Sequence, residues 1–247
     1  MKDILQDIVA HTHSLGFLTI VKVTSEEGAT NIDSMAEDRS VILTAETHNA
    51  VNTFDGVFGM PNLDKLNLHL KNPEYKDNAK IDVVKSNRND ETIPTHIHFE
   101  NEAGDFQNDY RFMSRTVIEE KMKTVKFKGA TWNVEFTPSV AAIQRLRLMS
   151  AAHSEEVVFN VSTEETDGVN DLIFSFGDQS THTGKFVFQN AVNGKLAHTW
   201  SWPVDQVQKI LGLSGDITMS ISDQGAMKIS VDSGMAKYDY ILPAQSK

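Results

Sequence analysis

Four segments of the chain repeat apolar side chains every three or four positions, which is the spacing of an amphipathic helix. They occupy residues 2–15, 61–71, 138–153 and 203–212. In the third segment we expect Thr137 to be the N-cap and Pro138 the first helical residue, where the missing N–H group costs nothing. The pattern therefore predicts four short helices, each burying one face.

Between these segments the chain alternates apolar and polar residues or carries runs of β-branched residues, and both patterns are typical of short strands. The expected strands are 17–23, 40–46, 80–84, 95–100, 109–113, 134–137, 156–162, 171–176, 184–192, 195–202, 216–222, 226–231 and 237–242. Residues 24–39 are expected to form a long loop. The elements together predict a β-rich chain of the α+β class.

The order of these elements repeats along the chain. Each half reads as a helix, about four strands, a short helix behind a proline and three strands, with Pro61 and Pro203 at matching positions 142 residues apart. Residues 114–130 have mixed charge and little alternation, so we interpret them as a connector. The predicted organisation is two similar domains, 1–113 and 131–247, joined by 114–130.

Composition narrows the class of protein. Hydrophobic residues make up 40% of the 247 residues and charged residues 23%, as in soluble globular proteins. The chain has no cysteine, which excludes disulfides, thiol catalysis and cysteine-ligated metal centres. The first residues lack the long apolar core of a signal peptide, and no run of about 20 apolar residues predicts a membrane span.

Charge decides whether nucleic acid is a plausible partner. A net charge of −11 would repel DNA if it were spread evenly, because DNA binding depends largely on cationic contacts to phosphate. Counting Lys and Arg against Asp and Glu gives −1 for residues 2–15, +1 for 59–71, +2 for 137–153 and 0 for 203–212. The helical segments thus carry +2 and the rest of the chain −13. Solvated basic residues on ordinary helices would produce a similar imbalance.

Candidate catalytic and metal-binding residues are few. His96 and His98 lie two positions apart in a predicted strand, hence on one face, where they could supply two metal ligands. The alternative is a solvent-facing pair that alternates with buried Ile97 and Phe99. The chain has no G-x-S-x-G motif, phosphate-binding glycine loop or H-E-x-x-H helix. We therefore predict no enzymatic activity and no cofactor.

Three stretches, 40–66, 134–162 and 225–244, carry a resemblance to a known family. With its repeated element order and paired short helices, the chain resembles DNA sliding clamps. It is most similar to the polymerase processivity clamps of T-even-type bacteriophages, and more distantly to the proliferating-cell nuclear antigen of eukaryotes. The resemblance covers nearly the whole chain. It implies the DNA clamp fold, in which two topologically similar domains, each with two helices on antiparallel β-sheets, assemble into a six-domain homotrimeric ring.

The resemblance also implies roles for individual residues. The DNA-facing side chains would be Lys2, Lys65, Lys71, Arg145, Arg147 and Lys209. The subunit interface would pair edge strands of neighbouring copies and include Phe106, Tyr110, Phe112, Lys185, Phe186 and Phe188. A pocket for partner peptides would include Val125, Phe127, Tyr240, Ile241, Leu242 and Pro243. Ordinary core packing is an alternative role for Tyr240 and Ile241.

A protein of this kind would encircle double-stranded DNA without sequence specificity. Its implied partners are a phage DNA polymerase and a clamp loader, in the cytoplasm of an infected bacterial host. Two other classes remain open at this stage. The acidic, strand-rich and cysteine-free composition also suits a β-sandwich structural protein of a virion, and His96 with His98 would suit a metal-dependent β-barrel enzyme.

Overall fold

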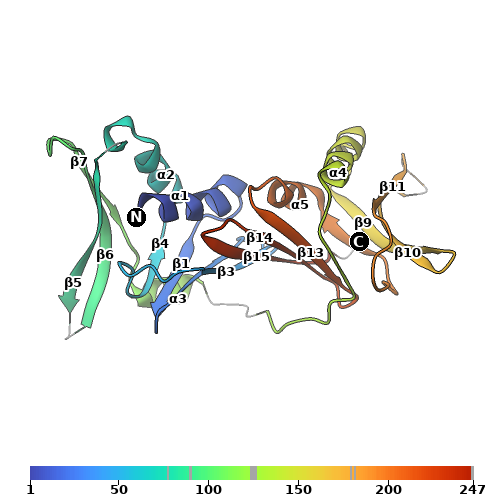
Figure 1. Cartoon of the computed structure of the whole chain (residues 1–247), viewed down its shortest axis with the longest axis horizontal. Helices are drawn as coiled ribbons and strands as arrows, with labels where there is room; N and C mark the ends of the chain where they lie inside the picture. Colours follow the sequence, from blue (N-terminus) through green and yellow to red (C-terminus); the bar gives the residue numbers. More distant parts are fainter. Residues whose placement is uncertain (77, 89–90, 123–126, 179, 181, 246–247) are drawn as a thin grey trace. The chain divides into compact units, whose positions relative to one another are not determined.

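The structure is a computed structural model that describes residues 1–76, 78–88, 91–122, 127–178, 180 and 182–245. The chain divides into two compact units (Figure 1). Unit 1 comprises Met1–Lys126 and Ser233–Tyr238, and unit 2 comprises Phe127–Asp232 and Asp239–Lys247. No helix in the described ranges combines the length and the apolarity that a membrane span requires.

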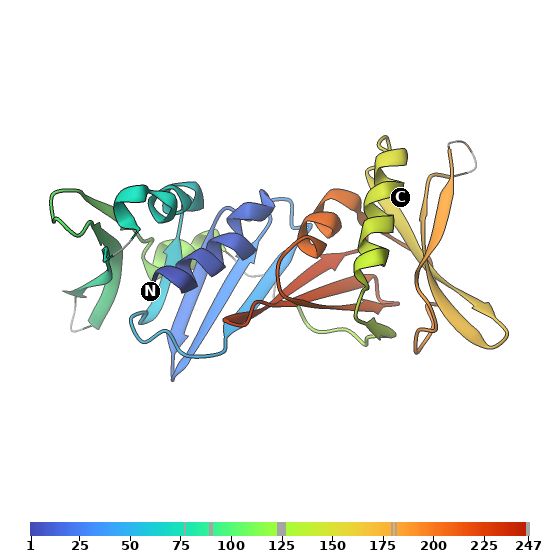
Figure 2. The ribbon, with the colours of Figure 1, turned by 45° about the horizontal axis from the view of Figure 1, so that its top comes forward.

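Unit 1 packs its helices onto two antiparallel sheets with the strand orders β4-β1-β2-β3 and β5-β6-β7. Helix α1 lies across β1–β3 (Figure 2), and Leu5 and Ile8 on its inner face are fully buried. Burying each such side chain contributes about 1.5–3 kcal/mol. The helices are α1 (Lys2–His11), η1 (His13–Leu15), α2 (Leu63–Lys71), η2 (Pro73–Tyr75) and α3 (Arg115–Lys121). The strands are β1 (Val21–Glu26), β2 (Ala29–Met35), β3 (Ile42–Thr47), β4 (Gly56–Met60), β5 (Lys80–Arg88), β6 (Glu91–Glu100) and β7 (Gln107–Arg111).

Unit 2 has sheets with the strand orders β11-β10-β9-β12 and β15-β14-β13-β8. Val207 and Ile210 on its second helix are fully buried, as the apolar stripe predicts. The fully buried Trp202 donates its Nε1–H to the carbonyl oxygen of Leu242 at 3.0 Å. The elements are β8 (Val134–Phe136), α4 (Val140–Ala152), β9 (Val158–Thr166), β10 (Val169–Phe176), β11 (Gly184–Gln189), β12 (Trp200–Pro203), α5 (Val204–Leu211), β13 (Asp216–Ser222), β14 (Ala226–Asp232) and β15 (Ala236–Pro243).

The strand order shows the internal repeat that the sequence predicts. The order β4-β1-β2-β3 has its counterpart in β12-β9-β10-β11, and β5-β6-β7 has its counterpart in β13-β14-β15. Pro61 and Pro203 occupy matching places, because each lies between a strand and the second helix of its repeat. By this correspondence β3 is equivalent to β11, and β7 is equivalent to β15.

The expected loop at residues 24–39 is wrong, because this range contains the end of β1 and all of β2. The two strands form a hairpin at Glu27 and Gly28, both with positive φ. The buried positions of β2 include Thr30 and Ser34, which are polar, so hydropathy alone did not reveal the strand. The Ser34 hydroxyl donates to the carbonyl oxygen of Ile20 at 2.6 Å, which makes its burial possible.

Two helix predictions also need correction. Helix α4 begins at Val140, and its N-cap is Ser139, whose Oγ accepts from the amide of Ala142 at 3.1 Å. Thr137 and Pro138 therefore precede the helix rather than capping and opening it. Helix α3 is not among the four predicted helices, because Ile118 is its one fully buried side chain and leaves no apolar stripe to detect.

Candidate nucleic-acid and subunit interfaces

Four of the basic side chains expected to face DNA are exposed on helices. Lys65 and Lys71 lie on α2, and Arg145 and Arg147 lie on α4. Within the described part of the chain, none of the four takes part in an ion pair of 4.0 Å or less. Their charges are therefore available to phosphate groups, which is the requirement for sequence-independent DNA contact.

The other two expected cations already have partners. The Nζ of Lys2 donates to the carbonyl oxygen of Tyr75 at 2.6 Å. The Nζ of Lys209 lies 2.8 Å from an Asp205 carboxylate oxygen one helical turn away. The hydrogen bond fixes the Lys2 side chain but leaves its charge, whereas the ion pair offsets the charge of Lys209.

Arg145 and Arg147 point to different sides of α4. Two positions correspond to about 200° around a helix. The Nη2 of Arg147 lies 3.2 Å from the place that a Cβ on Gly212 would occupy, so this side chain lies over the end of α5. Gln208 of α5 also donates to the carbonyl oxygen of Leu146 at 3.5 Å. Arg147 is thus on the α5 side of the helix, and Arg145 is on the opposite flank.

Strands β7 and β11 are edge strands. Within the described residues, β7 pairs with β6 alone and β11 pairs with β10 alone. The amide of Phe112 donates to the carbonyl oxygen of Thr95 on the β6 side at 2.9 Å. Because hydrogen-bonding positions alternate along an antiparallel strand, the backbone groups of Gln107, Asp109 and Arg111 point away from β6. They are free to pair with a further strand.

The side chains expected at a subunit interface have different environments. Tyr110 and Phe188 are core residues of their own units, with 4% and 3% exposure. Lys185 on β11 forms an ion pair at 2.9 Å with Glu164 on β9, which lies beyond β10 in the same sheet. The remaining rings keep accessible surface and belong to Phe106, Phe112 and Phe186.

The residues expected in a partner pocket fall into two groups. Tyr240, Ile241 and Leu242 are buried in the protein core, with exposures of 0%, 5% and 0%. Phe127 and Pro243, in contrast, are exposed. The Phe127 ring stacks on Trp132 with centroids 6.0 Å apart. The Nζ of Lys228 lies over the Trp132 ring, 5.1 Å from its centroid. Val125 lies outside the described residues.

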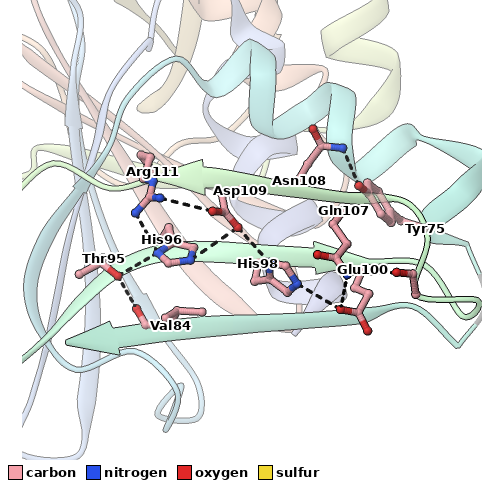
Figure 3. Close-up of polar contacts among 11 residues, drawn as sticks. Tyr75, Val84, Thr95, His96, His98, Glu100, Gln107, Asn108, Asp109 and Arg111 are labelled. Carbon is pink, nitrogen blue, oxygen red and sulfur yellow. Dashed lines mark hydrogen bonds and ion pairs between the residues drawn. The ribbon is translucent and has the colours of Figure 1, made fainter.

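A polar network covers the face of β6 and β7 that points away from the helices (Figure 3). Asp109 is its centre, since one carboxylate oxygen lies 2.9 Å from Nδ1 of His98 and 3.5 Å from Nε2 of His96. The other oxygen lies 3.4 Å from Nη2 of Arg111, and Nε2 of His98 lies 3.4 Å from Glu100. The two histidines share a face, as their spacing predicts.

The two histidines of this network have pKa values shifted in opposite directions. The hydrogen bond to Asp109 raises the pKa of His98 above its ordinary value. Burial lowers the pKa of His96, with the Asp109 charge acting in the opposite sense. Among the described residues, no group of three or more His, Asp or Glu side chains has the geometry to hold a metal ion. The contacts within the network are hydrogen bonds and ion pairs.

Comparison with known proteins shows the fold. No family model and no curated protein matches the chain. Solved structures do match. One is the structure of the C-terminal region of FEN-1 bound to A. fulgidus PCNA, which matches with a TM-score of 0.67 and 10% identity, covering 100% of this chain and 95% of the other. The chain has the clamp fold.

Two further clamps match over almost their whole length. PCNA from Thermococcus kodakaraensis matches with a TM-score of 0.67 and 9% identity, covering 98% of this chain and 97% of the other. The proliferating cellular nuclear antigen of Entamoeba histolytica matches with a TM-score of 0.64 and 10% identity, covering 99% and 94%. The clamp fold is thus retained where side chains have almost entirely changed, so roles of single residues have to be argued from this chain.

Two exposed leucines escaped the sequence predictions. Leu68 on α2 is 67% exposed and Leu148 on α4 is 71% exposed. Both leucines fall outside the apolar stripes of their helices, and this departure from the stripe can be seen in the sequence. A single exposed apolar side chain is ordinary on a protein surface, and it gains significance only within a larger contact region.

Proposed function

We propose that the chain is a DNA sliding clamp in which β7 of one copy pairs with β11 of the next. One observation carries the proposal. In unit 1, β3 lies beside the start of β15, at residues 236–238. The equivalent strands β11 and β7 each have an open edge. The chain therefore makes this pairing once and leaves the repeat-related edges open, which supports their pairing between copies.

Such a contact joins two different surfaces, so repeating it by rotation closes a ring. Three copies with two clamp-fold units each give the six-unit homotrimer of the family that the chain resembles. Closure covers the open edges of β7 and β11, which would otherwise be sites for unwanted strand pairing. The ring would encircle duplex DNA and hold it by topology, with the basic helix residues making weak phosphate contacts that permit sliding.

The clamp would act without enzymatic activity of its own, tethering a replicative DNA polymerase after placement by a clamp loader. Exposed Phe127 beside Trp132 and Lys228, together with Pro243, offers an apolar surface for their peptides. The three stretches that resemble T-even-type phage clamps support a phage origin and action in the cytoplasm of an infected bacterium.

Processive synthesis tests this function directly. Purified protein is added to the cognate polymerase and loader on a primed circular single-stranded template. We expect light scattering to give a mass of three chains and product length to rise well above that of polymerase alone. On a linear template with open ends the gain should be lost, because a ring can slide off. An unchanged product length on the circle, with the loader shown to be active, would overturn the proposal.

An edge variant supplies the matched control. Arg111→Pro removes the N–H group that points away from β6, while the hydrogen bonds between β6 and β7 stay intact. We expect this variant to retain its far-UV circular dichroism and to lose both the trimer mass and the gain in product length. Gln107→Ala, on the same strand, keeps the backbone donor and should behave as the unchanged protein.

A further inference from the structure

Leu68 and Leu148 lie on the helices that cover the two open edge strands. On α2, His69 packs on Phe99 of β6 with ring centroids 5.2 Å apart. The hydroxyl of Tyr110 in β7 donates to the carbonyl oxygen of Pro61, just before α2. Helix α2 therefore covers the face of β7 that carries the Tyr110 side chain.

Helix α4 has the same relation to β11. A Cβ on Gly184 would lie 2.5 Å from Cε of Met149 and 2.6 Å from Nε2 of His153, so the helix passes directly over this strand. Phe186 shares this face with Gly184, and its register partner is Phe174. Helix α4 therefore covers the apolar face of β11.

Pairing β7 with β11 of a second copy brings these helices together. A continuous sheet with one apolar face requires α2 and the neighbour's α4 to lie on the same side. Paired strands are about 4.8 Å apart and packed helices about 8–10 Å apart, so helices over adjoining strands come within packing distance. Their exposed flanks then face each other.

The flanks are complementary in charge as well as apolar. Asp64 lies one helical turn before Leu68, and Arg145 lies one turn before Leu148. All four side chains are exposed, and neither charge has an ion-pair partner within 4.0 Å in the described part of the chain. The helix side occupied by Leu148 and Arg145 faces away from α5, since Arg147 contacts the end of α5.

We propose that Leu68 of one copy packs against Leu148 of the next, with Asp64 and Arg145 forming an ion pair beside them. The partner that covers each exposed leucine is thus a second copy of this chain. The inference rests on the proposed ring and adds a second contact to it, between helices rather than strands. It also assigns different roles to the two arginines of α4. Arg145 serves the subunit contact, and Arg147 remains free to face DNA.

The absence of cysteine from the chain makes site-directed cross-linking a clean test. The double variant Leu68→Cys with Leu148→Cys is treated with a short-arm bismaleimide, which adds to thiols without an oxidant. We expect covalent dimers and trimers on a denaturing gel. An equal mixture of the two single variants should give dimers only, and each single variant alone should give none, because the contact joins unlike surfaces.

A matched control pairs Leu68→Cys with Val157→Cys, since Val157 is 77% exposed in unit 2 but lies outside α4. This pair should not cross-link. A trimer mass without cross-linking between positions 68 and 148 would overturn the helix contact and leave the ring intact. A single-chain mass at tens of micromolar would overturn both the helix contact and the proposed ring.

Charge reversal gives an independent readout. Asp64→Arg should weaken trimer association at least about tenfold with unchanged circular dichroism, because it places like charges together at the contact. Adding Arg145→Asp should restore most of the association. If the double variant is as weak as the single variant, the ion pair is not part of the contact.

Discussion

At the scale of single residues, Asp7 joins the first helix to a distant hairpin of unit 1. Its carboxylate accepts hydrogen bonds from the Tyr238 hydroxyl at 2.7 Å and the Ser233 hydroxyl at 3.0 Å. Burial would raise the pKa of Asp7, but hydrogen bonds with His11 and Tyr238 outweigh it and hold the pKa below its ordinary value. The charged form is therefore the one that the fold stabilises.

Asp7→Asn should lower the free energy of unfolding by about 1–3 kcal/mol at pH 7, since it weakens hydrogen bonds to a charged group. A lowered pKa gives stability that is complete above the unfolded value near 3.8 and lost as the pH falls through the folded value. The difference between the two proteins should therefore be constant above about pH 4 and shrink as the pH falls below 3.8. Urea unfolding across this range measures it, and a difference that stays constant below pH 3.8 would contradict the assignment.

The polar network on β6 and β7 gives a second prediction at this scale. In a nuclear magnetic resonance titration, His98 should lose its proton above pH 6.5 and His96 below it. Asp109→Asn should lower the pKa of His98, because the hydrogen bond to the carboxylate is the main cause of its shift. Two histidines that titrate together in the unchanged protein would show that the network is not formed in solution.

At the scale of elements, α3 is fixed by one close contact. A Cβ on Gly59 of β4 would lie 2.8 Å from Cδ1 and 2.9 Å from Cβ of Ile118, so the helix rests directly on the backbone of the strand. Gly59 also exchanges backbone hydrogen bonds with Met113, at 2.8 and 3.0 Å, just before α3 begins. The position of α3 thus depends on the absence of a side chain at residue 59.

Gly59→Ala should destabilise the protein by about 1–3 kcal/mol through overpacking. Combining it with Ile118→Ala should cost less than the two single changes added together, because the smaller side chain makes room for the new methyl group. The free energies of unfolding of the unchanged protein and the three variants, measured in urea, complete a double-mutant cycle. Additive costs would mean that α3 does not rest on Gly59.

The sequence predicted elements whose buried positions are apolar and missed those whose buried positions are not. The stripes at 61–71 and 203–212 led to α2 and α5, and the matching prolines revealed the repeat. Strand β2 escaped because Thr30 and Ser34 are buried polar residues satisfied by distant backbone groups that no local pattern shows. Helix α3 escaped because its main contact is with a glycine 59 positions earlier.

Candidate site residues were harder to predict than elements, because exposure depends on packing between segments far apart in sequence. Tyr240 and Leu242 were predicted to line a pocket from their position in the sequence, yet both are 0% exposed. Lys2 reads as a free cation, but its ammonium is bound by a carbonyl 73 positions away. Arg145 and Arg147 differ in environment because they point to different sides of α4 and only Arg147 lies beside Gly212 at the end of α5.

At the scale of the whole molecule, the net charge of −11 makes the placement of cations on the helices important for any contact with DNA. Arg147→Ala should leave the trimer mass unchanged and reduce the slope of log affinity for duplex DNA against log salt by about 1, as expected for one lost phosphate contact. Arg145→Ala should instead shift the mass toward single chains. Fluorescence anisotropy on a short duplex and light scattering give the two readouts, and identical behaviour of the variants would contradict their separate assignments.

The open edges of β7 and β11 also make the lifetime of the protein depend on how much of it is present. In the proposed ring, dilution below the dissociation constant would leave two unpaired strands in every copy, and such strands favour irreversible aggregation. The melting temperature should therefore rise with protein concentration, because assembly binds only the folded form. If the proposed ring forms, the copies assembled in it should therefore outlast unassembled copies, whose edge strands stay exposed.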